Sequence, residues 1–369
     1  MKQIIKLISC LLLVFVFVFS LSACGKKPDG SEQQGAQEET KHTCEYKVVE
    51  SFDRSNKYPK KLVCKTNSEH VIEKECIEIS NAEQLKKFAD DCNFKYDFGC
   101  YTFKLTDDID LKNTKWTPIT LLGVTSIYKN KNFVFDGNGK TISNFKTDSR
   151  NKVNSGLFGE INGEFNLTFK NLNIKNANIS ADLEDVGVEW GNSTINFGIG
   201  ALIGNITGLV GNLAIENCTV SQCTIEGAHW AGGLIGFADG PDDFAQVDYK
   251  ASISITNCKV EDTSVLCNGS AGSIVGHATG SRWLTNTISD CQIKNNIISC
   301  TGSSKIKAGS VMGTVGAGTV IVDNCTQENI EVTSGGEIND QKIFGRFGDA
   351  YLGKLTIDGV EIPNDTPVS

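Results

Sequence analysis

The segment Gly233-Leu-Ile-Gly236 and the following Ser252-Ile-Ser-Ile-Thr-Asn-Cys-Lys-Val260 show two patterns that return along the chain. The first is an apolar pair between small residues. The second alternates apolar and polar residues, is interrupted by one small polar residue, and then continues. A period of two residues predicts strands with one buried face, and the interruption predicts a bend between two strands.

The bend position carries only Asn, Asp or Gly in six units, and these residues tolerate a positive φ. The six residues are Asn171, Asn217, Asn257, Asp290, Asn324 and Gly359. Because no helical pattern separates the units, a bend at this repeating position winds the chain into stacked coils that contact only their neighbours. We therefore predict an all-β fold, a parallel β-helix, in which the bend side chains form a hydrogen-bonded ladder.

Cysteine follows four of the bends, at an inward position of successive coils. These residues are Cys218, Cys258, Cys291 and Cys325. Zinc sites typically combine paired cysteines at short spacing with further Cys or His ligands, a combination that the spacing here does not offer. Buried cysteine also acts as a small apolar residue. We expect packed thiols rather than disulfides here, no metal site and no cofactor.

The Gly-Leu-Ile-Gly strand followed by Asn-Cys-x-Val resembles the GLUG-motif repeats of bacterial surface proteins. Upstream, Phe135-Asp-Gly-Asn-Gly139-Lys-Thr-Ile142 is similar to the segment that often precedes such repeats. The resemblance covers residues 76–362 and implies a right-handed parallel β-helix of pectate-lyase-like architecture. It also implies a surface lipoprotein, an adhesin or an accessory region of a secreted enzyme.

The N-terminus has the pattern of a bacterial export signal. Lys2 and Lys6 precede an apolar run that is too short for a comfortable membrane span. The run ends in Leu21-Ser-Ala-Cys24, which resembles a lipobox. We expect residues 1–23 to be a lipoprotein signal peptide and Cys24 to carry the lipid. The protein would then be anchored to a membrane of the cell envelope with its domain facing outward, into the extracellular space or the periplasm.

Residues 24–41 form the expected tether, because after Cys24 they contain no large apolar side chain that could join a core. The formal net charge of the whole chain is −9, and removal of the signal peptide takes away two lysines and no acid, which gives −11. An acidic protein of this kind is a poor partner for nucleic acid.

Residues 42–75 predict a small β-hairpin in which Cys44 and Cys64 lie near each other, so that a disulfide between them is one option. Residues 76–362 contain the β-helix. It begins with a short helix after Ser80, whose apolar face would cover the first coil. A second disulfide option joins Cys92 to Cys100. Residues 363–369 are a tail.

Long insertions separate some repeats, and loops on a rigid scaffold are common recognition sites. The aromatic residues in or beside the insertions are candidates for stacking on a sugar or gripping a protein. They are Trp190, Trp230, Phe244, Tyr249 and Trp283. Packing of these rings over the coil edge is the alternative. The leading hypothesis is an adhesin or ligand-binding surface lipoprotein, whose ligand is a glycan or a protein of a host or neighbouring cell.

Two other functions remain open. A polysaccharide lyase or hydrolase of pectate-lyase-like fold would need clustered carboxylates, for Ca²⁺ or for hydrolysis, near a basic residue. Asp239, Asp242, Asp243 and Arg282 could serve such a site, although a solvated acidic loop explains the same pattern. We therefore assign no catalytic residue. A structural or accessory role in the envelope is the third hypothesis.

Overall fold

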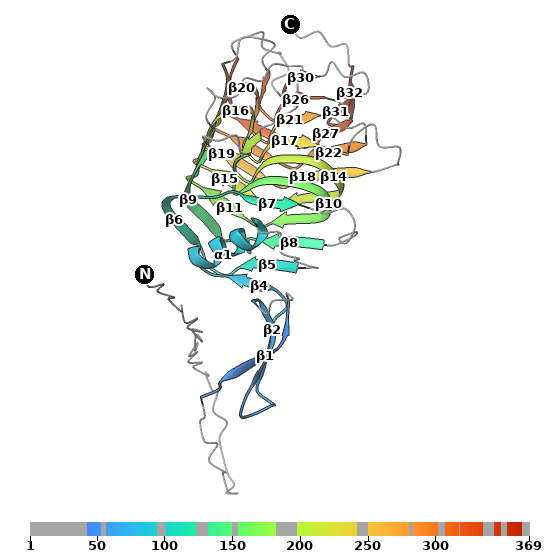
Figure 1. Ribbon diagram of the computed structural model, residues 1–369. Coiled ribbons are helices and arrows are strands. Elements are labelled where there is room, and N and C mark those ends of the chain that lie inside the picture. The colour runs from blue at the N-terminus through green and yellow to red at the C-terminus, as the bar shows by residue number, and fades with distance from the viewer. Residues whose placement is uncertain are drawn as a thin grey trace, which may run out of the picture. The chain divides into compact units, whose positions relative to one another are not determined.

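The computed structural model (Figure 1) divides into two compact units, Met1–Lys74 and Glu75–Ser369. The described residues are 43–52, 57–93, 101–122, 132–149, 154–181, 198–241, 250–279, 283–301, 307–316, 318–334, 343–347 and 353–363. The predicted signal peptide, the tether with Cys24, and the tail beyond residue 363 lie outside these ranges.

The first unit contains a three-stranded antiparallel sheet. Its strands are β1 (Tyr46–Ser51), β2 (Pro59–Cys64) and β3 (Val71–Glu73). The expected hairpin corresponds to β1 and β2, and β3 adds a strand that the sequence did not indicate. Exposed ion pairs join neighbouring strands, such as Lys60 with Glu50 at 2.6 Å, and pairs of this kind stabilise a protein only weakly.

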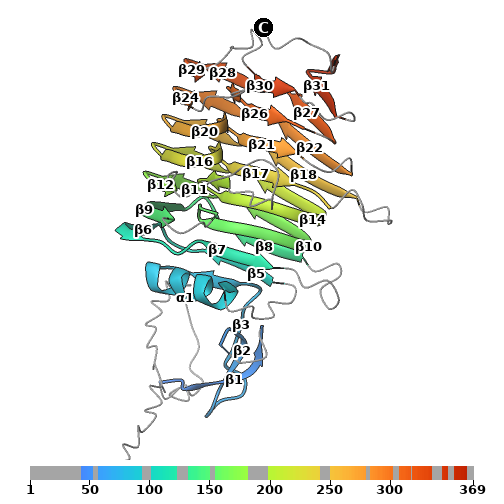
Figure 2. The ribbon, with the colours of Figure 1, turned by 45° about the horizontal axis from the view of Figure 1, so that its top comes forward.

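The second unit is built from two curled sheets in which successive repeats pair in parallel (Figure 2). Among the described residues the first sheet has 15 strands: β4 (Ile77–Ile79), β5 (Tyr101–Leu105), β7 (Ile119–Leu122), β8 (Asn132–Asp136), β10 (Phe158–Lys170), β14 (Ile203–Glu216), β17 (Ile235–Asp239), β18 (Ala251–Thr256), β21 (Val275–Thr279), β22 (Leu284–Ser289), β26 (Met312–Val315), β27 (Thr319–Asp323), β30 (Phe344–Phe347), β31 (Lys354–Ile357) and β32 (Val360–Ile362).

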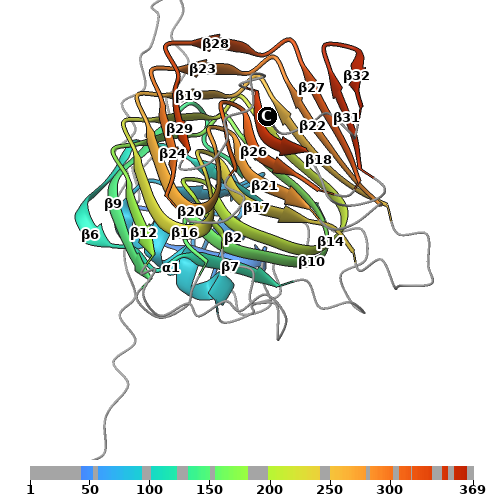
Figure 3. The same ribbon diagram turned by 90° about the horizontal axis from the view of Figure 1, so that it is seen from above.

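The second sheet has 14 strands within the same described ranges: β6 (Ile109–Lys115), β9 (Thr141–Ser149), β11 (Asn173–Lys175), β12 (Asn178–Ala181), β13 (Gly198–Gly200), β15 (Thr219–Ser221), β16 (Thr224–Gly232), β19 (Lys259–Glu261), β20 (Ser264–Gly272), β23 (Gln292–Lys294), β24 (Ile297–Cys300), β25 (Lys307–Gly309), β28 (Thr326–Glu328) and β29 (Glu331–Ser334). Seen from above, the layers wind around a shared interior (Figure 3). The predicted all-β class with parallel strands is confirmed.

Equivalent residues of successive repeats lie directly above one another. In one inward row Phe169 pairs with Ile215, Ile215 with Ile255, and Ile255 with Ile288. All four side chains are at most 1% exposed. This register follows from the alternation in the sequence, because a slip of one residue would turn every apolar side chain outward.

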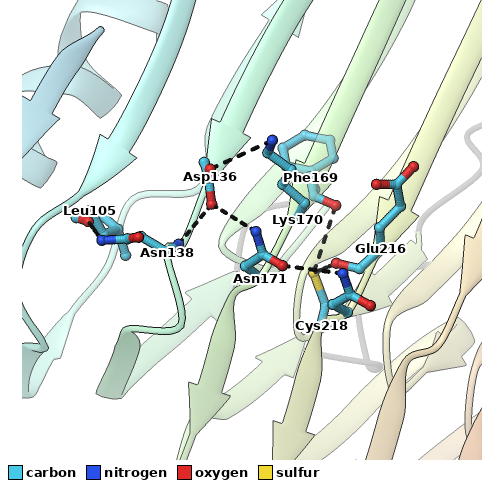
Figure 4. A network of polar contacts seen from close by, with 9 residues as sticks. Leu105, Asp136, Asn138, Phe169, Lys170, Asn171, Glu216 and Cys218 are labelled. Carbon is cyan, nitrogen blue, oxygen red and sulfur yellow. Dashed lines mark hydrogen bonds and ion pairs between the residues drawn. The ribbon is translucent and has the colours of Figure 1, made fainter.

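The bend residues connect strands of the first sheet to strands of the second. Asn171, Asn217, Asn257, Asp290 and Asn324 have φ between 49° and 55°. Their side chains form a ladder, in which Asn171 donates to Asp136 at 3.1 Å (Figure 4). Asn217 in turn donates to Asn171 at 3.2 Å. Asp290 has no side-chain N–H, so it accepts from Asn324 at 2.6 Å and cannot donate to Asn257.

The sixth predicted bend is different. Gly359 has a positive φ of 77°, but Asp358 before it also has a positive φ, of 46°. Two consecutive positive φ values suit a tight hairpin turn, and β31 and β32 are indeed antiparallel. Asp358, rather than Gly359, extends the ladder, because its carboxylate accepts from the backbone N–H of Asn324 at 2.8 Å. Gly359 thus has the positive φ predicted for the sixth bend, but it has no side chain with which to continue the hydrogen-bonded ladder.

A second bend lies five residues after the first and was not identified from the sequence. Its residues have φ between 50° and 57°, and they are Asn144, Asn176, Gln222, Asp262, Asn295 and Asn329. Five of them form parts of a second ladder, in which Asn176 donates to Asn144, Asn295 donates to Asp262 at 2.9 Å and Asn329 donates to Asn295 at 3.2 Å. Two bends per layer, rather than one, turn the chain around the interior.

Helix α1 (Ala82–Asn93) lies across one end of the stack (Figure 2). It begins one residue later than the sequence predicted, since Asn81 rather than Ser80 caps its first turn. The Asn81 side chain accepts from the backbone N–H of Gln84 at 3.0 Å, and the Gln84 side chain accepts from the backbone N–H of Ser80 at 2.7 Å. Its buried face contains Leu85, Phe88, Ala89 and Cys92, as the helical spacing predicted.

Candidate ligand-binding site

The Gly-apolar-apolar-Gly pattern forms narrow arches that connect a strand of the second sheet to a strand of the first. In one layer, β16 ends at Gly232 and β17 begins at Ile235. A Cβ at Gly232 would lie 1.9 Å from the Ile235 carbonyl oxygen and 2.7 Å from the backbone nitrogen of Gly276. Only glycine permits this approach. The arches therefore bring residues just before and just after the turn close together.

One arch carries an aromatic cluster, which we define as His229, Trp230, Phe237 and His277. The Trp230 and Phe237 rings are nearly parallel, with centroids 4.4 Å apart, and the His277 ring meets Trp230 edge-on at 5.2 Å. Phe237 is fully buried, whereas the other three residues are half-buried. Offset and edge-on contacts of this kind stabilise aromatic groups, so Phe237 supports Trp230 from inside the protein.

The cluster occupies a limited stretch of the stack. Phe237 pairs with Asn205 of the layer before and with His277 of the layer after, and His277 pairs with Thr314. Beyond His277 the contacts become polar, because the Ser270 hydroxyl lies 2.8 Å from the Thr314 hydroxyl. The aromatic surface is thus a local feature of two layers rather than a property of every repeat.

Burial lowers the pKa of His229 below its ordinary value. The imidazole is therefore neutral at neutral pH, with one nitrogen that donates and one that accepts a hydrogen bond. A neutral imidazole beside an indole face offers a planar apolar surface next to polar atoms. This combination suits a sugar ring, which has an apolar face and hydroxyl groups at its edge, and also suits a protein side chain that is partly apolar.

The inserted segments begin beside the cluster. In the layer of Phe237, β17 ends at Asp239 and β18 begins at Ala251. In the layer of His277, β21 ends at Thr279 and β22 begins at Leu284. The preceding layer has no such interruption, because β14 is continuous. The strands that precede the insertions therefore end within a few residues of Phe237 and of His277.

Two of the five aromatic candidates lie within the described residues. Trp230 is in the cluster, and Trp283 is a half-buried residue at the end of the second insertion, where its carbonyl accepts from the Ala251 backbone N–H at 3.1 Å. The remaining three, Trp190, Phe244 and Tyr249, lie outside the described residues. So do Asp242, Asp243 and Arg282 of the catalytic alternative, while the Asp239 carboxylate accepts from the Gly240 backbone N–H at 2.8 Å.

Sequence reasoning missed Phe237 and the two histidines. His229 and His277 occupy different positions in their repeats, yet both lie beside Trp230. A usable signal was the residue that follows the Gly-apolar-apolar-Gly pattern, which is Phe237 in one repeat and His277 in the next.

The cysteine ladder packs as thiols beside the first bend. Cys218, Cys258 and Cys291 are buried and Cys325 is half-buried. The Cys258 thiol donates to the Thr256 carbonyl at 3.4 Å, and the other three make the same contact two residues back. The adjoining thiol of the previous layer raises the pKa of Cys258 and of Cys291 to about 12. Cys258 and Cys291 are therefore protonated and unreactive at neutral pH.

Three of the four cysteines suggested as disulfide partners lie within the described residues. Cys44 and Cys64 come close to each other in the first unit and are thiols in this structure. Cys92 is buried in α1, where desolvation raises its pKa well above the ordinary value, and its suggested partner Cys100 lies outside the described residues. Within the described part of the chain, no helix is long and apolar enough to cross a membrane.

Comparison with known proteins yields little. No protein-family model matches the chain, and no curated protein matches it. A solved structure from Bacteroides ovatus, provisionally assigned as an immunoglobulin A1 protease, is similar with a TM-score of 0.39 and 16% sequence identity. That similarity covers 78% of this chain and 79% of the other, and it is too distant to support an argument about function.

Proposed function

We propose that this protein is a lipid-anchored surface lipoprotein whose GLUG-like repeats form a right-handed parallel β-helix that binds a glycan or protein ligand, as an adhesin does. Parallel pairing of each strand with its counterpart in the next repeat supports the β-helix. So do the two bends per layer. A solenoid of this kind presents an extended, rigid surface on which inserted loops can recognise a partner.

The observation that carries the binding role is the aromatic cluster. Trp230 is half-buried, and its indole is held against Phe237 in a nearly parallel arrangement. A ring that is fixed by the core loses little conformational entropy when a ligand stacks on it. Tryptophan in such a setting is typical of residues that contribute most to binding. The partner would be a glycan, or a protein with an aromatic or apolar anchor, on a host or neighbouring cell.

Replacement of Trp230 by alanine is expected to weaken binding at least about tenfold, which corresponds to about 1.4 kcal/mol. The probes are a printed glycan array and immobilised extracellular-matrix proteins, and affinity for each positive probe is then measured in solution. Trp230→Tyr keeps a ring on Phe237 and should recover most of the binding. Ile297→Ala is the matched control, because Ile297 is an exposed apolar residue of β24, 43% exposed.

Thermal melting of each variant shows whether the fold is intact. If the wild-type protein binds a probe and Trp230→Ala binds it equally well, the aromatic cluster is not the binding site. Binding that Ile297→Ala weakens equally would show that the loss is not specific to the cluster.

The lipid anchor makes a separate prediction. In a bacterial host that is fed labelled palmitate, the wild-type chain should be labelled and should partition with membranes. Cys24→Ala should abolish both, because the proposed anchor is attached to that sulfur. Cys10→Ala is the control, since Cys10 lies within the apolar run of the signal. Label that persists in Cys24→Ala would contradict lipidation at this residue.

A further inference from the structure

Two thiols and one imidazole meet in the first unit. The Sγ atoms of Cys44 and Cys64 and one ring nitrogen of His70 all lie within 4.8 Å of one another. The Cys44 Sγ atom is 3.1 Å from the His70 Nδ1 atom. Thiolate and imidazole are the donors that zinc prefers in proteins. The group arises from three separate segments, so its spacing in the sequence matches no paired-cysteine motif.

Backbone hydrogen bonds hold the three residues in place. The Lys65 N–H donates to the Glu45 carbonyl at 2.7 Å, which ties the segment after β2 to the segment before β1. The Cys64 N–H donates to the His70 carbonyl at 2.9 Å, which fixes the connection between β2 and β3. The donors are thus brought together by the sheet itself, and such preorganisation lowers the cost of binding a ligand.

We propose that Cys44, Cys64 and His70 bind a thiophilic divalent cation, with Zn²⁺ as the ion that their chemistry fits best. A tetrahedral zinc with ordinary bond lengths needs donor atoms about 3.6–3.8 Å apart. The donor atoms of the cluster, all within 4.8 Å of one another, are close to this spacing. Three protein donors leave one position for water or a further side chain. This proposal replaces the expectation, drawn from the spacing of the cysteines, that the chain has no metal site.

The first unit has few buried apolar side chains, so a cross-link would add to its stability. Its three short strands expose large apolar side chains, among them Val48 at 40%, Val49 at 49% and Val71 at 43%. A unit this small with so little buried apolar surface usually requires a metal or a disulfide for stability. A bound ion joining the start of β1, the end of β2 and the start of β3 would supply it.

The competing arrangement is the Cys44–Cys64 disulfide that the sequence suggested. Oxidation would consume both thiolates and prevent metal binding, so the two arrangements exclude each other. The experiment therefore uses the full chain, purified in detergent under reducing conditions, and titrates it with Zn²⁺ in competition with a chromophoric chelator. Co²⁺ serves as a spectroscopic substitute, because thiolate ligands give it an intense charge-transfer band in the near ultraviolet.

We expect one tight Zn²⁺ site and a Co²⁺ band of thiolate character. Cys44→Ser and Cys64→Ser should each weaken Zn²⁺ binding at least about tenfold and remove most of the band, and His70→Gln should weaken binding by a similar factor. Cys325→Ser is the control and should change neither result, because Cys325 belongs to the other unit. Hydrogen exchange on the wild type should show protection of β1, β2 and β3 on adding Zn²⁺, which tests the site without any variant.

Three results would overturn the proposal. The first is the absence of the Co²⁺ band from the reduced wild-type chain. The second is a band that persists in Cys44→Ser and Cys64→Ser. The third is a Cys44–Cys64 cross-linked peptide in the non-reducing digest of protein from its native envelope, which would assign the cysteines to the disulfide.

Discussion

Gly232→Ala will destabilise the second unit by about 3 kcal/mol or more. The new Cβ would lie 1.9 Å from the Ile235 carbonyl oxygen, and both residues belong to strands that pair with the next layer. In an ordinary strand the same substitution stabilises the protein by about 0.5–1 kcal/mol. The sign of the change in the free energy of unfolding therefore tests the arch directly. Chemical denaturation, followed by tryptophan fluorescence, measures this free energy.

Gly139→Asn is the matched control for Gly232→Ala. Gly139 has a positive φ of 73°, and no atom lies within 4 Å of a Cβ built at that position. Asparagine adopts such a φ readily, so the expected change is within about 0.5 kcal/mol. If Gly232→Ala unfolded at the same denaturant concentration as the wild type, the close approach of the two strands at the arch would be wrong.

The fold could be predicted from the sequence where the rules are local. Asn257 marks a left-handed bend because few residues tolerate that backbone conformation, and the alternation around it sets the buried face. The second bend was missed although five of its six residues are Asn or Asp, the same signal that marks the first bend. Gln222 is the exception: it has a φ of 56° although glutamine has no preference for this region, so at that position the stacked layers impose the conformation.

The candidate sites were predictable only in part, because they depend on which strands the fold brings together. Trp230 attracted attention by its residue type. Its contacts with Phe237 and His277 depend on the arch and on the pairing of successive layers, which residue spacing alone does not specify. The group formed by Cys44, Cys64 and His70 is a stronger example, since three separate segments contribute one donor each.

The glycines and the aromatic cluster are physically linked. The arch allows the end of β16 to approach the start of β17, and Trp230 and Phe237 occupy those two positions on either side of it. A residue with a side chain at Gly232 would push the strands apart and would also separate the two rings. In this layer the glycine that permits the arch therefore also positions the two rings that we propose bind the ligand.

Phe88→Ala will weaken the end of the stack by about 3–5 kcal/mol. The Phe88 side chain is fully buried, and its ring centroid lies 4.4 Å from that of Phe103 and 5.6 Å from that of Phe135. It therefore fixes α1 to β5 and β8 at once. Removing the ring leaves a cavity among aromatic side chains that the surrounding strands cannot fill without breaking their parallel register. Lys86→Ala is the control, because Lys86 is an exposed residue of the same helix.

Phe88→Ala should loosen the end of the stack before it affects the rest of the second unit, because each layer of a repeat protein is stabilised mainly by its neighbours. Hydrogen exchange should quicken first in α1, β5 and β8, while β18 and β22 in the middle of the stack keep their protection. Loosening α1 also uncovers strand edges that can pair with another chain, so the variant should aggregate more readily than Lys86→Ala. Uniform acceleration across the stack would instead mean that the second unit unfolds as one cooperative block, with α1 an integral part of it rather than a separable cover.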